Sequence, residues 1–290
     1  MWAIYAFLSA FFVATTDPIA KRNLKADDEY VVGWMLLAVS SVFLGVYYFF
    51  YGTFRIGPGL VATLLAIIPL EILASILYYR ALKLTDISLS VPFLALTPVF
   101  VVLTGFLVLG ERVSPAGTIG IVLIAIGVYS LNIKEAKYGW TTPIRAIFLN
   151  RGSVYMLAVA FVFSVSASVS KRVMLLSSPE QAPFIYNFSI AVAMAPIIVY
   201  RLASGRSVLS RDRRSIISYA ALGLFAALSS IFFFKSMSCA NVAYAISIKR
   251  LSLLISVGYG WLFFRERDVH IRLVSTVCMV LGIGMILICR

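Results

Sequence analysis

Two adjacent cations, Lys249 and Arg250, lie near the middle of the apolar run 240–264. About 20 apolar residues span a bilayer as a helix, so the run is long enough to cross one. Charges at that depth cost several kcal/mol unless they face a partner or a water-filled cavity. Arg offers a planar fork for carboxylate or phosphate, and Lys offers a compact point charge. We therefore interpret the pair as a site for an anionic group; the alternative is a buried ion pair that only holds helices together.

Polar side chains within two turns of this pair could complete the site. Ser247 and Ser252 could donate hydrogen bonds and leave room for a ligand, and Tyr244 could line a cavity. Packing against other helices or facing lipid would explain Tyr244 equally well. The sequence predicts Lys249, Arg250, Ser247, Ser252 and Tyr244 as substrate-binding residues.

Two carboxylates lie within the predicted transmembrane helices. Glu71 is near the middle of an apolar run, in Ile-Pro-Leu-Glu-Ile-Leu, and Asp17 precedes Pro18 near the end of the first run. Glu71 could exchange a proton, because an apolar environment disfavours the charged form of a carboxylate. It could also be a static counter-ion to the cationic pair. Asp17 could bind a cation, cap or break its helix, or pair with Lys21 near the surface. Both are retained as candidate coupling residues.

Other kinds of chemistry have little support in the residues. The chain has one histidine, His270, and three cysteines in or beside apolar runs, so no metal-ligand spacing and no disulfide framework follows. No glycine-rich loop ending in Lys-Ser/Thr is present, which disfavours a nucleotide-driven pump. We expect no metal, no cofactor and no enzyme activity, since paired carboxylates at helical spacing and an acid–base histidine are both missing.

The composition is that of an all-α membrane protein. Of the 290 residues, 61% are hydrophobic and 13% are charged, against roughly 45–50% and ~25% in soluble domains. The net charge of +13 comes mostly from basic residues in short loops, so we expect no nucleic-acid partner. We predict a multi-pass protein of the cell (inner or plasma) membrane. The ten expected transmembrane helices are 2–20, 31–51, 58–79, 87–109, 115–133, 153–176, 182–202, 215–234, 241–264 and 271–289.

The chain repeats itself. Residues 78–112 align without a gap with residues 233–267 at a fixed offset of 155, and the first predicted helix repeats at an offset of 150. The predicted repeats are 1–137 and 150–290, joined by a connecting loop at 138–149. Each half has five helices, an odd number, so the second half starts on the opposite side of the membrane. The fold prediction is therefore two inverted five-helix repeats, an architecture of secondary transporters with the site at the repeat interface.

The sequence Tyr-Tyr-Arg-Ala-Leu-Lys-Leu-Thr-Asp at 78–86, followed by Leu-Gly-Glu-Arg-Val-Ser at 109–114, resembles the EamA family of the drug/metabolite transporter superfamily. The resemblance covers nearly the whole chain and implies ten helices, a central cavity and export or exchange of small metabolites. Locally, Lys249-Arg250 is similar to the Lys-Arg pair with which plastid triose- and sugar-phosphate transporters hold phosphate. Those proteins add a lysine on the fourth helix, whereas the repeat-equivalent of Lys249 here is Leu94.

The leading hypothesis is a secondary transporter, an exporter or exchanger of a small anionic metabolite by alternating access. The alternatives are a flippase for lipid headgroups and a membrane-embedded enzyme that uses Lys249 and Arg250 as an anion clamp. The expected partners are a small-molecule substrate, membrane lipid, and protons or a counter-substrate; a monomer is compatible with this. Basic residues gather after odd-numbered helices, which predicts termini outside the cell, whereas the family resemblance implies termini inside.

Overall fold

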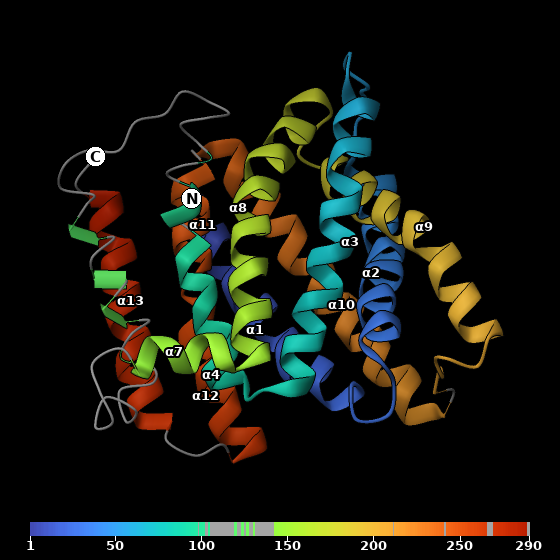
Figure 1. The fold of residues 1–290 in the computed structure, drawn as a ribbon. Coiled ribbons are helices and arrows are strands. Elements are labelled where there is room, and N and C mark those ends of the chain that lie inside the picture. The colour runs from blue at the N-terminus through green and yellow to red at the C-terminus, as the bar shows by residue number, and fades with distance from the viewer. Residues whose placement is uncertain are drawn as a thin grey trace.

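The computed structural model describes residues 1–97, 99–101, 104, 119–120, 123–124, 126–127, 130, 142–210, 212–240, 242–265 and 269–288. The described chain is all-helical (Figure 1). Six of its helices are long and apolar enough to cross a membrane. They are α1 (Trp2–Asn23), α2 (Glu29–Tyr51), α3 (Leu60–Leu84), α8 (Arg151–Leu176), α9 (Ala182–Ala203) and α10 (Arg213–Cys239).

The remaining described elements are shorter or less apolar. They are α4 (Ile87–Ser90), the 3₁₀ helix η1 (Val91–Leu96), α7 (Thr142–Leu149), α11 (Val242–Lys249), α12 (Ser252–Phe264) and α13 (Val269–Ile288). Most of the predicted fifth transmembrane helix, 115–133, lies outside the described residues, so the count of ten stays a prediction. The predicted connecting loop at 138–149 contains α7.

Polar side chains cap the N-termini of three of the six long helices, α2, α8 and α10. Asp28 caps α2 by accepting a hydrogen bond from the Val31 N–H at 2.9 Å. Asn150 caps α8 in the same way, from the Ser153 N–H at 3.1 Å. Such caps satisfy donors that have no partner within the helix. From 22 to 27 residues then follow in each long helix, enough to cross about 30 Å of hydrocarbon.

The connections between helices gather at two opposite ends, which we call face A and face B. On face A, the α2–α3 connection meets the α8–α9 connection, where the Gly57 N–H donates to the Leu176 carbonyl at 2.7 Å. On face B, the α1–α2 connection meets the α9–α10 connection, where the Ser210 N–H donates to Asp27 at 2.9 Å. Figure 1 shows face A at the top and face B at the bottom. The first helices of the two repeats, α1 and α8, therefore run in opposite directions, as inverted repeats require.

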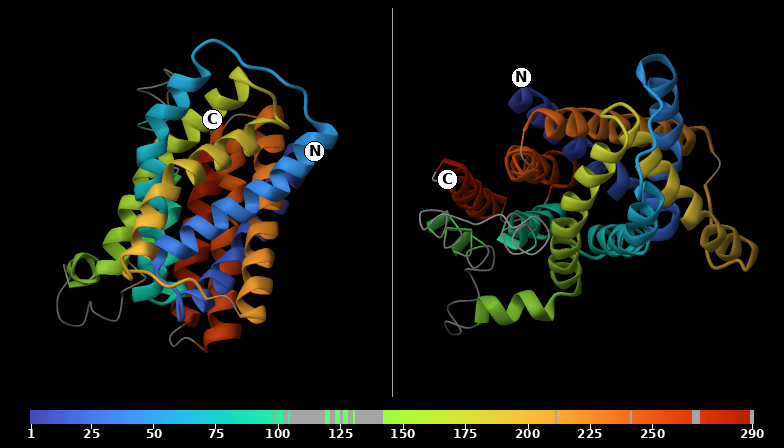
Figure 2. Two further views of the ribbon diagram at one scale, coloured as in Figure 1. Left: turned by 90° about the vertical axis from the view of Figure 1, so that its right-hand side faces the viewer. Right: turned by 90° about the horizontal axis from the view of Figure 1, so that it is seen from above.

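The two halves interlock through equivalent helix pairs. The long helix α1 packs along α10, and α3 packs along α8 (Figure 2). Because α1 corresponds to α8 and α3 to α10, the repeat operation exchanges the two pairs. Small residues permit the close approach of α1 and α10: Ala6 and Ala10 are fully buried, and the hydroxyls of Ser9 and Ser229 lie 3.1 Å apart.

The predicted ninth helix is not continuous, and this corrects the sequence analysis. α11 ends at Lys249 and α12 begins at Ser252. Between them, the Leu251 N–H bonds to the carbonyl of Ile248, three residues back rather than four. The predicted fourth helix is irregular at the equivalent place, because α4 passes into the 3₁₀ helix η1 with Pro92 near its start. With the offset of 155, the break at 250–251 corresponds to positions 95–96 inside η1.

Candidate substrate cavity between the repeats

A cavity of about 280 Å³ lies between the two halves. Side chains from α1, α2, α3, α8, α9, α10, α11 and α12 line it. Four of the lining residues are charged: Asp17 and Glu71 from the first repeat, Lys249 and Arg250 from the second. Their formal charges sum to zero. With Ser252, which also lines the cavity, the structure thus brings together five of the seven residues that the sequence predicts for binding and coupling.

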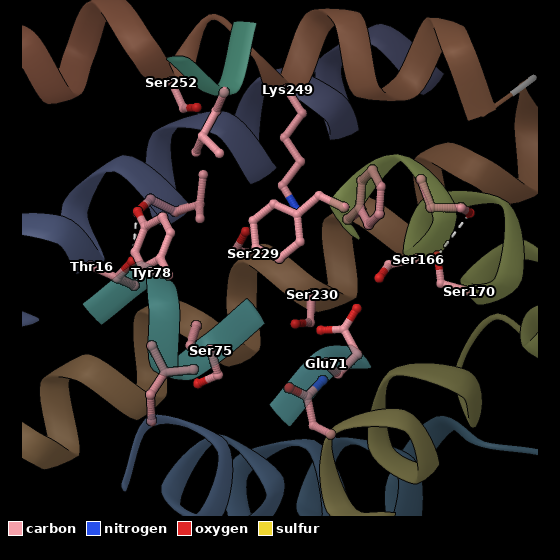
Figure 3. Close-up of a pocket in the computed structure, with 18 of the residues that line it drawn as sticks. Thr16, Glu71, Ser75, Tyr78, Ser166, Ser170, Ser229, Ser230, Lys249 and Ser252 are labelled. Atoms are coloured by element: carbon pink, nitrogen blue, oxygen red, sulfur yellow. Dashed lines mark hydrogen bonds between the residues drawn. The ribbon is translucent and has the colours of Figure 1, made fainter. Parts of the chain in front are cut away.

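Lys249 reaches the cavity because it is the last residue of α11, just before the break. Figure 3 shows its chain extending inward from one side of the cavity. Its Nζ lies 3.9 Å from the centroid of the Phe233 ring, a cation–π contact. Such a contact contributes roughly 0.5–2 kcal/mol, less than the several kcal/mol needed to bury a charge. No carboxylate lies within salt-bridge distance of Nζ in the described part of the chain.

Arg250 is buried more deeply, with 8% of its surface exposed. Its Nη2 donates to the Thr97 hydroxyl at 2.7 Å, while its Nε is buried and has no hydrogen-bond partner. The described residues place no carboxylate in an ion pair with it either. Leaving a buried donor unpaired costs about 1–3 kcal/mol, more when the group is charged. The guanidinium therefore has unused capacity for an acceptor.

Asp17 lies inside the protein, 3% exposed, so it is not the shallow residue pairing with Lys21 that one interpretation suggested. Its carboxylate accepts hydrogen bonds from Tyr78 of α3 and from Ser256 of α12, the latter at 2.6 Å. Lys21 instead donates to the Thr85 carbonyl at 3.1 Å. Asp17 thus joins helices of both repeats, and two neutral hydroxyls fix both of its oxygens.

Glu71 faces the cavity from the side opposite Lys249 in Figure 3. The Tyr186 hydroxyl donates to its Oε1 at 2.8 Å. In the described residues the Glu71 carboxylate lies in no salt bridge, so no direct ion pair joins it to Lys249 or Arg250. Its bonding therefore differs from that of Asp17, whose two oxygens accept from two different helices.

Other predicted and unpredicted residues can now be placed. Ser252 lines the cavity, as predicted. The side chains of Tyr244 and Ser247 lie outside the described residues, although their backbone belongs to α11. The sequence analysis did not place Tyr78, Thr97 or Phe233 at the site. The repeat alignment pairs Tyr78 with Phe233 and Thr97 with Ser252, so it contained the signal that would have found them.

The fold and cavity define a class: a helical membrane protein with two inverted repeats around a polar internal site. A family model for the EamA-like transporter family matches residues 1–133 and 150–288. The chain therefore belongs to the EamA-like transporter family, a family of transporters. One solved crystal structure has a similar fold, with a TM-score of 0.71 and 16% sequence identity. The match covers 100% of this chain and 97% of the other. At this identity the match shows the fold alone. No curated protein matches the chain.

Proposed function

We propose that this protein is a secondary transporter in the cell membrane that moves a small anionic metabolite by alternating access. The observation that carries the proposal is the state of the two buried cations. Among the described residues, Arg250 has an unpaired Nε, and Lys249 has an aromatic ring beside its ammonium and no carboxylate within salt-bridge distance. A carboxylate or phosphate group in the cavity would accept from the guanidinium and neutralise the ammonium together.

The paired helix breaks support the same location for the site. Discontinuous helices at matching positions of two inverted repeats mark the substrate sites of several transporter folds. Here the break in the second repeat follows Lys249 and falls on Arg250, and η1 occupies the matching place in the first repeat.

Ion coupling belongs to the proposal as well. Glu71 and Asp17 are the two carboxylates of the cavity, and either could carry a proton while the site changes sides. In the described chain neither is committed to a salt bridge, which leaves both able to respond to a ligand charge.

The test begins with a thermal-shift screen of purified protein against sulfate, inorganic phosphate, pyruvate and succinate, with choline and glucose as cationic and neutral comparisons. We expect at least one anion to raise the melting temperature, because a ligand that binds only the folded state stabilises it. The anion found should then show counterflow in liposomes. Stabilisation by choline alone would contradict the anionic proposal. Movement of a lipid headgroup probe without solute counterflow would favour a flippase, and chemical conversion of the solute an enzyme.

A further inference from the structure

We infer that Glu71 and the substrate anion take turns as the partner of Lys249, so that one proton enters the site with each anion. This inference rests on the proposed function. In the empty transporter the Glu71 carboxylate neutralises the Lys249 ammonium. When an anion binds the ammonium, Glu71 loses its counter-ion and takes a proton from water. The formal charge of the cavity stays at zero in both forms.

Lys249 is placed where it can change partners. Its ammonium rests 3.9 Å from the centroid of Phe233, a ring that cannot hydrogen-bond. The repeat-equivalent of Phe233 is Tyr78, whose hydroxyl holds Asp17. The absence of a hydroxyl at 233 leaves Lys249 without a fixed acceptor on that side. Its four-carbon chain extends into the cavity toward the side from which Glu71 faces it (Figure 3).

Glu71 is the carboxylate suited to the exchange, and Asp17 is not. Asp17 accepts from Tyr78 and Ser256, on two helices. Glu71 accepts from the Tyr186 hydroxyl of α9. A hydroxyl can donate to a carboxylate and to the carbonyl oxygen of a carboxylic acid alike, so the Tyr186 contact is compatible with both protonation states. Besides Tyr186 and Lys249, the charged and titratable groups lining the cavity are Asp17, Tyr78, Tyr79 and Arg250.

Asp17 and Arg250, the other two charged residues of the cavity, keep their charges in this scheme. Arg250 donates to Thr97 and is 8% exposed, with less freedom to move than the lysine at the helix end. Asp17 and Arg250 contribute one negative and one positive charge in every state. Glu71 alone changes its protonation state in this scheme. The result is electroneutral cotransport of one proton and one monovalent anion.

The first experiment needs no ligand. It measures the melting temperature of the parent protein, Glu71→Gln, Lys249→Met and the double variant, without added small anions. If Glu71 neutralises Lys249 in the empty state, removing either charge alone destabilises the protein, and removing both restores much of the loss. The control cycle combines Lys249→Met with Asp17→Asn. We expect the changes in melting temperature of these two single variants to add in the double variant more nearly than those of the Glu71–Lys249 cycle.

The second experiment measures proton uptake in weakly buffered solution with a pH indicator. Its probe is whichever of sulfate, inorganic phosphate, pyruvate and succinate raises the parent's melting temperature, with the titration of the probe itself subtracted. We expect about one proton per bound monovalent anion for the parent and close to none for Glu71→Gln, because binding and protonation are linked. Glu71→Asp keeps the carboxyl group and should retain the uptake.

The outcomes separate the two proposals. If none of the four anions stabilises the parent, the anion-binding proposal fails, and the partner exchange fails with it. If an anion binds but Glu71→Gln takes up as many protons as the parent, the exchange is wrong while anion binding stands. An additive Glu71–Lys249 cycle would contradict the exchange in the same way.

Discussion

The two repeats match in shape around the cavity and differ in charge. Ser75 and Ser230 both line it at equivalent positions. The charged residues follow a different rule: both carboxylates belong to the first repeat and both cations to the second. The repeat-equivalents of Asp17, Glu71, Lys249 and Arg250 are Ala167, Ala226, Leu94 and Ala95. Symmetry therefore accounts for the scaffold and its hydroxyls, and departure from symmetry accounts for the polarity of the site.

The two faces repeat this contrast at the membrane surface. On face B, Asp28 pairs with Arg201 at 3.1 Å and Glu29 pairs with Arg80 at 3.0 Å. On face A, the position equivalent to Asp28 is Ser178, whose hydroxyl donates to the Thr53 carbonyl at 3.3 Å. In the described residues, charged pairs thus hold face B together, and neutral hydrogen bonds hold this part of face A. Four tests by substitution show how far the comparison between halves and faces extends.

The largest effect is expected from Arg250→Gln, which removes the guanidinium from the charged repeat. One charged hydrogen bond contributes about 1.5–3 kcal/mol, so anion affinity should fall by roughly ten- to a hundredfold. Arg250→Lys should also weaken binding if the contact is bidentate, because lysine cannot supply the fork. The measurement is a titration of the stabilising anion by thermal shift.

The matched control for this substitution is Arg272→Gln, on α13. Arg272 pairs with Asp86 at 2.9 Å and does not line the cavity. It should change stability while leaving anion affinity close to that of the parent. Equal affinity in Arg250→Gln and the parent would mean that Arg250 has a structural role only.

A smaller effect is expected from Asp28→Asn, which weakens the charged contacts of face B. Burial raises the pKa of Asp28, but hydrogen bonds from Ser207, the Val31 N–H and Arg201 outweigh it, so the pKa lies below its ordinary value of 3.8. A depressed carboxylate pKa stabilises the fold above the unfolded-state value, and this contribution disappears as pH falls through the folded-state value. Loss of these bonds should lower stability by about 1.5–3 kcal/mol at pH 7.

The same experiment includes its own pH control. The difference in melting temperature between Asp28→Asn and the parent should shrink as the pH falls from about 4, the unfolded-state pKa, through the lower pKa of Asp28 in the folded protein. Ser178→Ala on face A loses two neutral bonds, one to the Thr53 carbonyl and one from the Gln181 N–H. It should be milder, about 1 kcal/mol, because neither bond involves a charged group, and it should show no such pH dependence. If Ser178→Ala proved the more destabilising variant, the contrast between the faces would be wrong.

Much of this arrangement could be predicted from the sequence, and the parts that could not have physical causes. Apolar runs and the repeat offset predicted helices, inversion and a central site, because hydrophobic length and duplicated charges are local signals. The break after Lys249 was missed, since the run 240–264 is mostly apolar on both sides of Lys249 and Arg250 and a 3₁₀ turn leaves no period in the sequence. Tyr186 was missed because its partner Glu71 lies on another helix and nothing in the spacing relates them.

A third test adds charge to the uncharged repeat. Leu94 is 5% exposed, lines the cavity and is the repeat-equivalent of Lys249. Leu94→Lys should lower the melting temperature, since it buries a third cation. It should also shift preference toward phosphate over a monocarboxylate by about tenfold, the value of one additional charged contact. Leu94→Met is the control for size. An unchanged ratio of phosphate to pyruvate affinity would show that position 94 does not face the ligand.

The smallest effect is expected where the two repeats are most alike. Lys21 donates to the Thr85 carbonyl at 3.1 Å, and its repeat-equivalent Lys171 donates to the Ala240 carbonyl at 3.2 Å. Each lysine thereby binds a carbonyl just beyond the third helix of its own repeat, which is where that helix has unsatisfied acceptors. Lys21→Met and Lys171→Met should each lower stability by about 1 kcal/mol.

These two lysines also test whether the symmetric contacts are only structural. Both side chains are partly exposed, so solvent can replace part of the lost contact. We expect the two variants to agree within about 1 kcal/mol in chemical denaturation, because Lys21 also lies 5.2 Å from the centroid of the Phe264 ring. Both should keep the anion affinity of the parent. If Lys171→Met abolished counterflow while Lys21→Met left it intact, the asymmetry of function would extend beyond the four charges of the cavity to face A. Equal, mild losses of stability would confine it to the cavity, where the repeats differ in charge.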